Sequence, residues 1–347
     1  MANIKDIARE AGVSIGTVDR VIHERGRVSD ETKNRILRVM EELNYKPNIV
    51  AQGLAVSKKK LNLCYLVMDS TRNPFFYDIR IAAEKEAVKL KEYGVHVNIC
   101  TLYHDENNDI LITDKVREAV KASDGIAAMG LRSRAVRDLL KEAADAGIPI
   151  VFYNCRLKNV DYLAFVGCDY VASGKLAAGL VALTGGRKAR VGIFSEEAVG
   201  DDKIESYQER VQGFQQELEE NYPAIRITDR EIIEYDHEKN TRMVEQTLLE
   251  HPEINVAYIV NPADYQVCEA IRKADPNQQI SIITNDLAGR QIDMVRDGTI
   301  SATICQEPAR QGAKPLQILF QYLAYGKKPA RKNYYTKLSI HIAQNIY

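Results

Sequence analysis

The residues best suited to specific polar contacts lie on one face of a short helix near the N-terminus. Ser14 can cap this helix, and Val18, Val21 and Ile22 mark its inward face. The outward face then carries Ile15, Gly16, Asp19, Arg20 and His23. Such a face can exchange hydrogen bonds with base edges in the major groove of DNA. An ordinary helical hairpin with no nucleic-acid role is the alternative at this point.

Three further helices must position that face. In the preceding helix, Asn3 can serve as the cap, Asp6 suits the first turn and Gly12 ends the helix. Its apolar face consists of Ile4, Ile7, Ala8 and Ala11. The spacing predicts a helix-turn-helix, followed by a third helix that begins at Ser29. After Pro47, residues 48–55 predict a helix of about two turns, which is marginal in water and should fold only when docked.

From residue 61 onward, apolar strands alternate with amphipathic helices, which predicts doubly wound parallel sheets. Strands are expected at 61–68, 95–100, 125–129, 149–153, 189–194, 256–260, 279–283 and 302–305, with a helix around 76–93. So many strands indicate two sheets that face each other across a cleft. Ligands of open α/β sheets bind beyond the carboxyl ends of the strands, so the residues there are the candidates for a binding site.

Amides, arginines, a carboxylate and two aromatic rings follow these strands. They are Asn73, Phe75, Phe76, Asn154, Arg156, Arg210, Asn261, Asp286 and Gln306. A sugar offers a C–H face that stacks on a ring and hydroxyls that need fixed polar partners, so the set fits a polyhydroxy molecule. Taken singly, each residue also fits a plain structural interpretation, such as a proline turn that leads two aromatics into the core.

Charge and composition restrict the class of protein. The 347 residues exceed one usual core, so two or three domains are expected. Residues 1–60 hold 12 basic and 8 acidic side chains, against 35 basic and 40 acidic in the remainder. This asymmetry suits a protein that contacts phosphates only through its N-terminal part.

Several classes of function find no support in the sequence. The six cysteines form no CxxC pair, and the histidines lack metal-ligand spacing. Phosphate-binding loops and nucleophile elbows are also missing, so no catalysis, cofactor or metal is expected. Because the chain opens directly with the helix-turn-helix and has no run of about 20 apolar residues, we expect a cytoplasmic protein without a signal peptide or membrane span.

In combination, residues 4–8, 13–21, 27–29 and 43–48 resemble the headpiece of the lactose-repressor (LacI/GalR) family. The resemblance implies that Ile15, Gly16 and Arg20 read bases and that Leu54 wedges into a minor-groove step. The full set expected to contact DNA is Ile4, Lys5, Ser14, Ile15, Gly16, Thr17, Asp19, Arg20, His23, Asn48, Ala51 and Leu54. Asp19 departs from the serine that is common in the family.

The remainder of the chain resembles the type I periplasmic binding-protein fold, close to ribose-type sugar binders. This resemblance implies an effector site formed by the strand-end residues above, with Tyr235 as an additional candidate. Pro262 after Asn261, and Thr284-Asn285 before Asp286, depart from the usual pattern and indicate that one wall of the site is more polar.

These observations predict an α/β protein with an all-α headpiece and two doubly wound subdomains. The expected parts are a headpiece at 1–46, a hinge helix and linker at 47–60, and an effector domain at 61–347, divided into an N-subdomain (61–167 and 307–327) and a C-subdomain (168–306 and 328–347). The expected function is a homodimeric repressor that a sugar releases from a near-palindromic DNA operator. A regulator that needs a nucleobase-type co-repressor, and a small-molecule binder without a DNA role, are the alternatives; dimer versus tetramer stays open.

Overall fold

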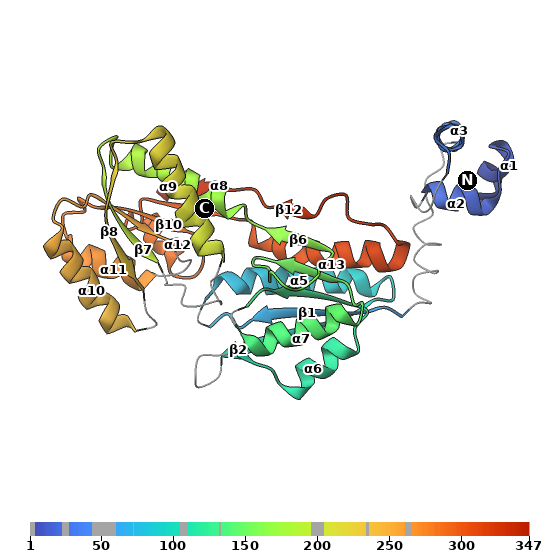
Figure 1. Ribbon diagram of the computed structural model, residues 1–347, viewed down its shortest axis with the longest axis horizontal. Coiled ribbons are helices and arrows are strands. Elements are labelled where there is room, and N and C mark those ends of the chain that lie inside the picture. Colours follow the sequence, from blue (N-terminus) through green and yellow to red (C-terminus); the bar gives the residue numbers. More distant parts are fainter. Residues whose placement is uncertain are drawn as a thin grey trace.

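The computed structural model describes residues 4–22, 28–43, 60–71, 73–104, 110–131, 133–195, 205–233, 236–260 and 265–346. Within them, three N-terminal helices precede a body of two α/β subdomains (Figure 1). The predicted fold class is therefore confirmed. Six candidate site residues lie outside the described residues: His23, Asn48, Ala51, Leu54, Tyr235 and Asn261.

The headpiece is a small bundle whose helices follow the predicted pattern. Its helices are α1 (Ile4–Glu10), α2 (Ile15–Ile22) and α3 (Asp30–Glu42). Ile7, Val18 and Ile36, one from each helix, are fully buried against one another. The Ser14 hydroxyl accepts a hydrogen bond from the Thr17 amide at 3.1 Å, which caps α2 as the sequence predicts. The apolar spacing therefore fixes which face of α2 is left outward.

The first sheet has seven strands in the order β12-β6-β5-β4-β1-β2-β3. Their bounds are β1 (Asn62–Met68), β2 (His96–His104), β3 (Ile110–Leu111), β4 (Gly125–Met129), β5 (Ile150–Tyr153), β6 (Ala164–Gly167) and β12 (Asn333–Tyr335). Helices α5 (Phe75–Lys91) and α13 (Pro308–Tyr325) pack together on one face, and α6 (Asp114–Lys121) and α7 (Arg134–Asp145) lie on the other (Figure 1). Strands β1, β4 and β5 read as continuous apolar runs because helices cover both faces.

The second sheet has six strands in the order β13-β11-β10-β9-β7-β8. Its strands are β7 (Arg190–Ser195), β8 (Arg226–Ile232), β9 (Val256–Ile259), β10 (Ser281–Asn285), β11 (Ala302–Cys305) and β13 (Ser339–His341). The helices around it are α8 (Tyr170–Thr184), α9 (Glu205–Asn221), α10 (His237–Glu250), α11 (Tyr265–Ala274), α12 (Gln291–Arg296) and the short 3₁₀ helix η2 (Ala343–Asn345). Two separate clusters of buried apolar residues fill its two faces.

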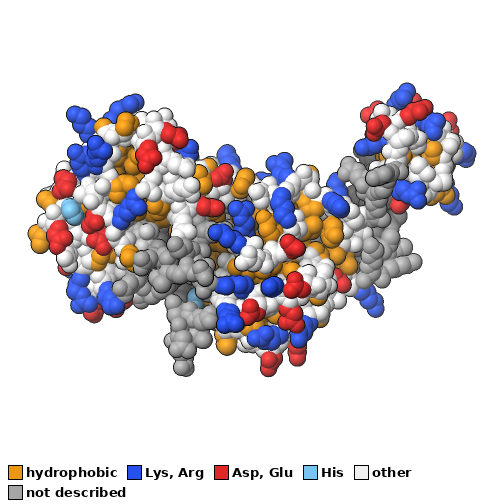
Figure 2. Space-filling model, in the orientation of Figure 1, with side chains coloured by type: hydrophobic (Ala, Val, Ile, Leu, Met, Phe, Trp, Pro, Cys, Tyr) orange, Lys and Arg blue, Asp and Glu red, His pale blue; other side chains and the backbone are white. Residues whose placement is uncertain are grey.

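The eight predicted strands are all present, whereas β3, β6, β8, β12 and β13 were not predicted. Edge strand β8 is largely half-buried and carries several charges, so it lacks an apolar run. Strand β12 pairs in parallel with β6 and so joins the first sheet, which differs from the expected placement of 328–347 with the second subdomain. The chain thus passes between the sheets after β6, after β11 and after β12. Acidic and basic side chains alternate over the visible face of both subdomains (Figure 2).

Helices α8 and α9 approach each other so closely that glycine is required at the contact. A Cβ atom on Gly213 would lie 2.0 Å from the Val171 carbonyl oxygen, and one on Gly174 would lie 1.9 Å from the Arg210 carbonyl oxygen. No side chain fits at such distances without moving backbone. The two glycines therefore set the spacing that holds Arg210 beside the start of α8.

We expect Gly213→Ala to lower the free energy of unfolding by at least about 2 kcal/mol, because the added methyl group forces two backbones apart. Urea unfolding measures the loss. Gly179→Ala is the matched control on α8, since its Cβ would meet only the Tyr222 hydroxyl, at 4.0 Å. That variant should be as stable as the unmodified chain or about 1 kcal/mol more so. Equal losses in the two variants would contradict this account.

Candidate functional site

Three residues predicted from strand ends meet in the structure through one bridging glutamine. The Gln306 side-chain amide donates a hydrogen bond to Asp286 Oδ2 at 3.0 Å. Gln311 Nε2 donates to Gln306 Oε1 at 3.2 Å, and Gln311 Oε1 accepts from Asn154 Nδ2 at 3.2 Å. A chain of side-chain amides thus joins β5 of the first subdomain to the end of β10 in the second.

The backbone at these strand ends is held in the left-handed region. Asn154 has φ 56°, Asp286 has φ 65° and Glu307, next to Gln306, has φ 50°. Asparagine and aspartate enter this region more readily than other side chains, yet such residues persist only where the surrounding structure fixes them. They cluster at binding sites in proteins generally, so their grouping here marks these strand ends as a candidate site.

Two opposite charges are buried on the second subdomain's side of this cluster. Arg210 and Asp286 are each only 1 % exposed. Burial raises the pKa of Asp286 to about 6, although the Arg210 charge and the Gln306 hydrogen bond oppose the shift. Burial also lowers the pKa of Arg210, but the neighbouring negative charges, chiefly Asp286, outweigh it and leave that pKa raised. Both groups are therefore charged near neutral pH.

Arg210 is fixed from two sides. Its Nη1 donates to the Val260 carbonyl at 3.3 Å, and its guanidinium lies 4.9 Å from the centre of the Tyr170 ring. The same carbonyl accepts from Asn285 Nδ2 at 3.0 Å. Asn285, which the sequence marked as a departure from the family pattern, is thus directed into the protein, and its Oδ1 accepts from Ser173. The Asn285 side-chain amide thus helps to hold the Val260 carbonyl where it accepts from Arg210.

The pair still has capacity for further hydrogen bonds. Arg210 Nε and Asp286 Oδ1 are buried and have no hydrogen-bond partner among the described residues. Leaving such groups unsatisfied costs about 1–3 kcal/mol each, so buried polar atoms are normally paired. A hydroxyl group can accept from the guanidinium and donate to the carboxylate. The arrangement therefore fits a hydroxylated ligand.

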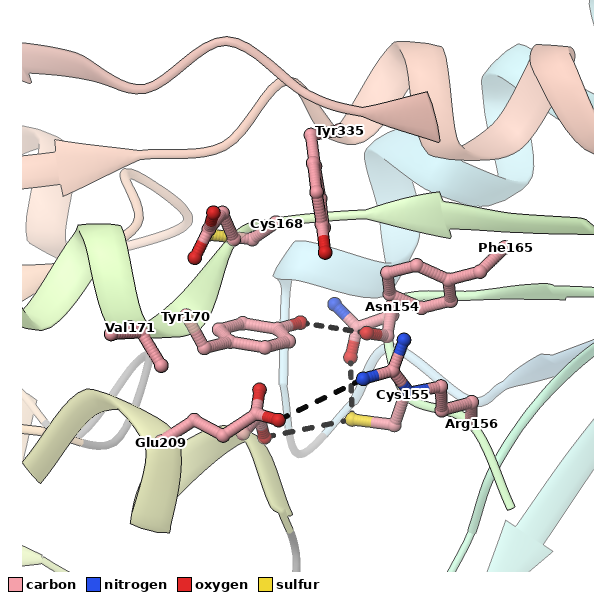
Figure 3. A pocket seen from close by; sticks show the side chains of 11 residues that line it. Asn154, Cys155, Arg156, Phe165, Cys168, Tyr170, Val171, Glu209 and Tyr335 are labelled. Carbon is pink, nitrogen blue, oxygen red and sulfur yellow. Dashed lines mark hydrogen bonds and ion pairs between the residues drawn. The ribbon is translucent and has the colours of Figure 1, made fainter. Parts of the chain in front are cut away.

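A cavity of about 100 Å³ lies between the two subdomains (Figure 3), and one of its lining residues, Tyr170, has its ring against the Arg210 guanidinium. It is lined by Asn154, Cys155, Arg156, Phe165, Cys168, Asp169, Tyr170, Val171, Ser206, Glu209 and Tyr335. The Tyr170 hydroxyl donates to the Asn154 carbonyl at 2.8 Å. Arg156 lies over the Phe165 ring at 5.2 Å, and its Nη2 is 3.8 Å from Glu209 Oε1. Burial raises the pKa of Glu209, and Arg156 limits that rise.

The sequence missed Tyr170, Glu209 and Gln311. Tyr170 begins α8 three residues after the end of β6, so the strand-end rule would have found it if that four-residue strand had been recognised. Glu209 and Gln311 lie within helices, where no strand-end rule applies.

The Asn73-Pro74-Phe75-Phe76 segment forms a turn that leads one aromatic ring into the core and leaves the other as a candidate ligand contact. Asn73 Oδ1 accepts from the Phe75 amide at 3.0 Å and so shapes the turn. Phe75 is buried in the core of the first subdomain, while Phe76 is partly exposed and touches it edge-on at 5.6 Å. A Cβ on Gly289 would lie 2.8 Å from Pro74, which shows that the two subdomains touch here. Phe76 therefore stays the better candidate for a ligand contact.

The outward face of α2 has the composition that the periodicity predicts. Ile15, Gly16 and Arg20 are exposed and Asp19 is half-buried. In the turn before it, the hydroxyls of Ser14 and Thr17 are 2.9 Å apart. Ile4 is half-buried and Lys5 is exposed at the start of α1.

Within the described ranges, no group of three histidine, cysteine, aspartate or glutamate side chains could hold a metal ion. The helices of that same part of the chain include none that is long and apolar enough to cross a membrane.

Comparison with known proteins gives two matching family models. Residues 64–328 match the periplasmic binding protein domain, and residues 3–48 match the bacterial regulatory proteins of the lacI family. Two curated relatives are 32% identical: the HTH-type transcriptional regulator DegA of Bacillus subtilis (218 residues; 62% of this chain, 60% of the relative) and the ribose operon repressor of Lactococcus lactis (191 residues; 55% and 54%). The matches thus span little more than half the length of these relatives.

Solved structures share the fold of the body. A putative LacI transcriptional regulator from Bacteroides fragilis matches with a TM-score of 0.69 at 21% identity, covering 82% of this chain and 98% of that one. The glucose-galactose binding protein GanP from Geobacillus stearothermophilus matches with a TM-score of 0.67 at 23% identity over the same shares. The expected periplasmic binding-protein fold is therefore confirmed.

We expect Arg210→Met to lower the free energy of unfolding by about 3–5 kcal/mol at pH 7, because it leaves the Asp286 charge buried without a partner. Folding raises the pKa of the Asp286 carboxyl, so its burial lowers the free energy of unfolding only at pH values where the unfolded chain would ionise it. Since more of the buried carboxyl is protonated at pH 5, the loss caused by Arg210→Met should be smaller there. Urea unfolding at both pH values measures it. Adding Asp286→Asn should restore part of the stability at pH 7; a loss independent of pH would contradict the pairing.

Proposed function

We propose that this protein is a DNA-binding repressor controlled by a small-molecule effector. The chain belongs to the periplasmic binding protein domain family and carries an N-terminal module of the lacI family of bacterial regulatory proteins. The single observation that carries the effector role is the buried Arg210–Asp286 pair with its unsatisfied Nε and Oδ1 atoms. The same geometry favours binding over catalysis, because Gln306 and Gln311 are already engaged in holding the cluster together. Action on DNA places the protein in the cytoplasm.

The charges around the cleft favour an uncharged, hydroxylated effector such as a sugar. The Arg210 and Asp286 charges cancel, and so do those of Arg156 and Glu209. A phosphorylated ligand would find no excess positive charge at these four residues. The name of the ribose operon repressor among the relatives supports the same class. A nucleobase-type co-repressor is the alternative. Operator affinity that falls when the effector binds would indicate release, and affinity that rises would indicate a co-repressor.

Two chains are proposed to bind one near-palindromic operator, with Arg20 on the DNA-facing side of each α2. Exposed apolar side chains on α5 and on the β2–β3 hairpin support self-association: Tyr77, Val88, Tyr103 and Leu111. Tyr77 and Val88 lie about three helical turns apart and so share one face of α5. The headpieces of a pair joined through this face would reach two half-sites.

The effector would act on the angle between subdomains. Asp286 belongs to the second subdomain, while Asn154 belongs to the first, and the amide chain through Gln306 and Gln311 connects them. A ligand that hydrogen-bonds to Arg210 Nε and Asp286 Oδ1 therefore favours one angle between the sheets. Operator release follows only if the effector binds the DNA-incompetent angle more tightly.

Operator fragments selected from random DNA should bind the full chain with an affinity that falls steeply with salt, and with two chains per fragment. Arg20→Ala and Leu54→Ala should each weaken this binding by about tenfold or more, through lost base and minor-groove contacts, without changing effector affinity. Arg226→Ala, at an exposed position on β8, is the control. Salt-independent binding, or equal losses in all three variants, would argue for a binder without a DNA role.

Thermal-shift titration with ribose, galactose, glucose 6-phosphate and hypoxanthine tests the effector class. A neutral sugar should stabilise the protein, and Asp286→Asn should weaken its binding by about tenfold to hundredfold, because a charged hydrogen bond is lost. Asp138→Asn, on the exposed face of α7, is the control. Stabilisation by hypoxanthine alone, or sugar binding unaffected by Asp286→Asn, would overturn the proposed effector.

A further inference from the structure

A second and larger hollow lies on the first subdomain, apart from the Arg210–Asp286 cluster. It is a groove of about 790 Å³ formed mainly by α5, by α13 and by the segment that leads to β12, and Ile22 of the headpiece helix α2 also lines it. This volume lies within the range of about 300–1,000 Å³ that is common for small-molecule sites. No residue of the Arg210–Asp286 cluster lines it, so it is a separate candidate site.

Aromatic rings line one side of this groove. The Tyr93 and Phe320 ring centres are 5.4 Å apart, and those of Phe320 and Tyr325 are 5.5 Å apart. Tyr334 also lines the groove. Phe320 is buried beneath, whereas the three tyrosines are half-buried and reach the groove. Such partly exposed rings can stack on the flat face of a heteroaromatic ligand.

The remaining walls carry an excess of positive charge. Lys89, Lys314, Lys327 and Lys328 line the groove together with one carboxylate, Glu86. Glu86 is buried and already paired with Lys89 at 3.3 Å. No carboxylate forms an ion pair with the other three lysines within the described ranges; Lys314 instead lies 5.6 Å from the Tyr334 ring centre. The lining thus has three uncompensated positive charges, in contrast to the balanced cleft.

These lysine side chains are not needed to satisfy the carbonyl groups at the C-terminus of α13. Gly326, with φ 67°, ends the helix in the left-handed conformation. Its amide donates to the Tyr322 carbonyl at 2.8 Å, and the Lys327 amide donates to the Gln321 carbonyl at 3.2 Å. Backbone groups therefore satisfy the last carbonyls. Lys314 lies about three turns before this end, beyond the reach of the helix dipole's terminal charge.

We propose that this groove, here called the lysine groove, binds a nucleoside monophosphate or a closely similar phosphorylated heteroaromatic molecule. The phosphate lies among Lys314, Lys327 and Lys328, whose ammonium groups act as point charges for it. The base stacks on the half-buried tyrosines, and the side-chain amides of Gln317 and Gln321, which also line the groove, are placed to meet sugar or base hydroxyls and amines. This assignment stands without the proposed repressor function.

Isothermal titration calorimetry of the full chain with AMP, adenosine and inorganic phosphate, at constant ionic strength, tests the proposal. AMP should bind saturably, and adenosine and phosphate at least about tenfold more weakly, because each keeps only one part of the interaction. The double variant Lys314→Gln/Lys328→Gln should weaken AMP binding by at least about tenfold, which corresponds to one decade of Kd. Thermal unfolding confirms that this surface variant stays folded.

Two controls separate the lysine groove from other sources of binding. Lys85→Gln/Lys91→Gln removes two exposed charges from α5 that do not line the groove, and AMP affinity should not change. Glu209→Gln alters a partly exposed side chain of the cleft cavity and should also leave AMP affinity unchanged. No saturable AMP binding, equal losses in both lysine double variants, phosphate binding as tight as AMP, or loss of AMP binding in Glu209→Gln would each overturn the proposal.

Discussion

The electrostatic attraction between the buried charges of Arg210 and Asp286 is the interaction on which the site depends. Removing two opposite charges from water costs several kcal/mol per ion, and their attraction offsets this only when further hydrogen bonds complete the geometry. Gln306 supplies one such bond to Asp286, and the Val260 carbonyl supplies one to Arg210. The glycine contacts between α8 and α9 then hold Arg210 at its place beside Tyr170. Arg210 Nε and Asp286 Oδ1 have no hydrogen-bond partner among the described residues, and a ligand hydroxyl group can pair with both.

The same pair can transmit a signal because its partners belong to different subdomains. Gln306 connects Asp286 to Gln311 on α13, and Gln311 connects to Asn154 at the end of β5. α13 packs along α5 in the first subdomain, whose first strand, β1, follows the predicted hinge and linker in the sequence. In the proposed function, a ligand that hydrogen-bonds to Arg210 and Asp286 changes the free energy of one arrangement of the two sheets relative to another. We propose that the helix predicted at 48–55, which lies outside the described residues, is the element that responds, because a helix of about two turns that contains Gly53 is marginal in water.

Sequence reasoning succeeded where one local rule sufficed. Continuous apolar runs located β1, β4 and β9, and the strand-end rule selected Asn154, Asp286 and Gln306, which hydrogen bonds link through Gln311 in the structure. It failed where tertiary contacts decide. Gln311 joins the site from the interior of a helix, β12 finds its sheet only by pairing with β6, and Phe75 belongs to the core because α5 packs it there. The lysine groove combines helices distant in sequence, so no spacing of residues could have indicated it.

The number of protons exchanged when the effector binds tests the central claim most directly. Asp286 has a pKa of about 6 in the folded protein, and a ligand hydroxyl that donates to its carboxylate stabilises the charged form and lowers that pKa. Binding near pH 6 should therefore release part of a proton, and affinity should fall as the pH drops below about 6. Calorimetry in two buffers of different ionisation enthalpy should show this release at pH 6, none at pH 8, and none in Asp286→Asn. Proton uptake, or no exchange at pH 6, would contradict the account.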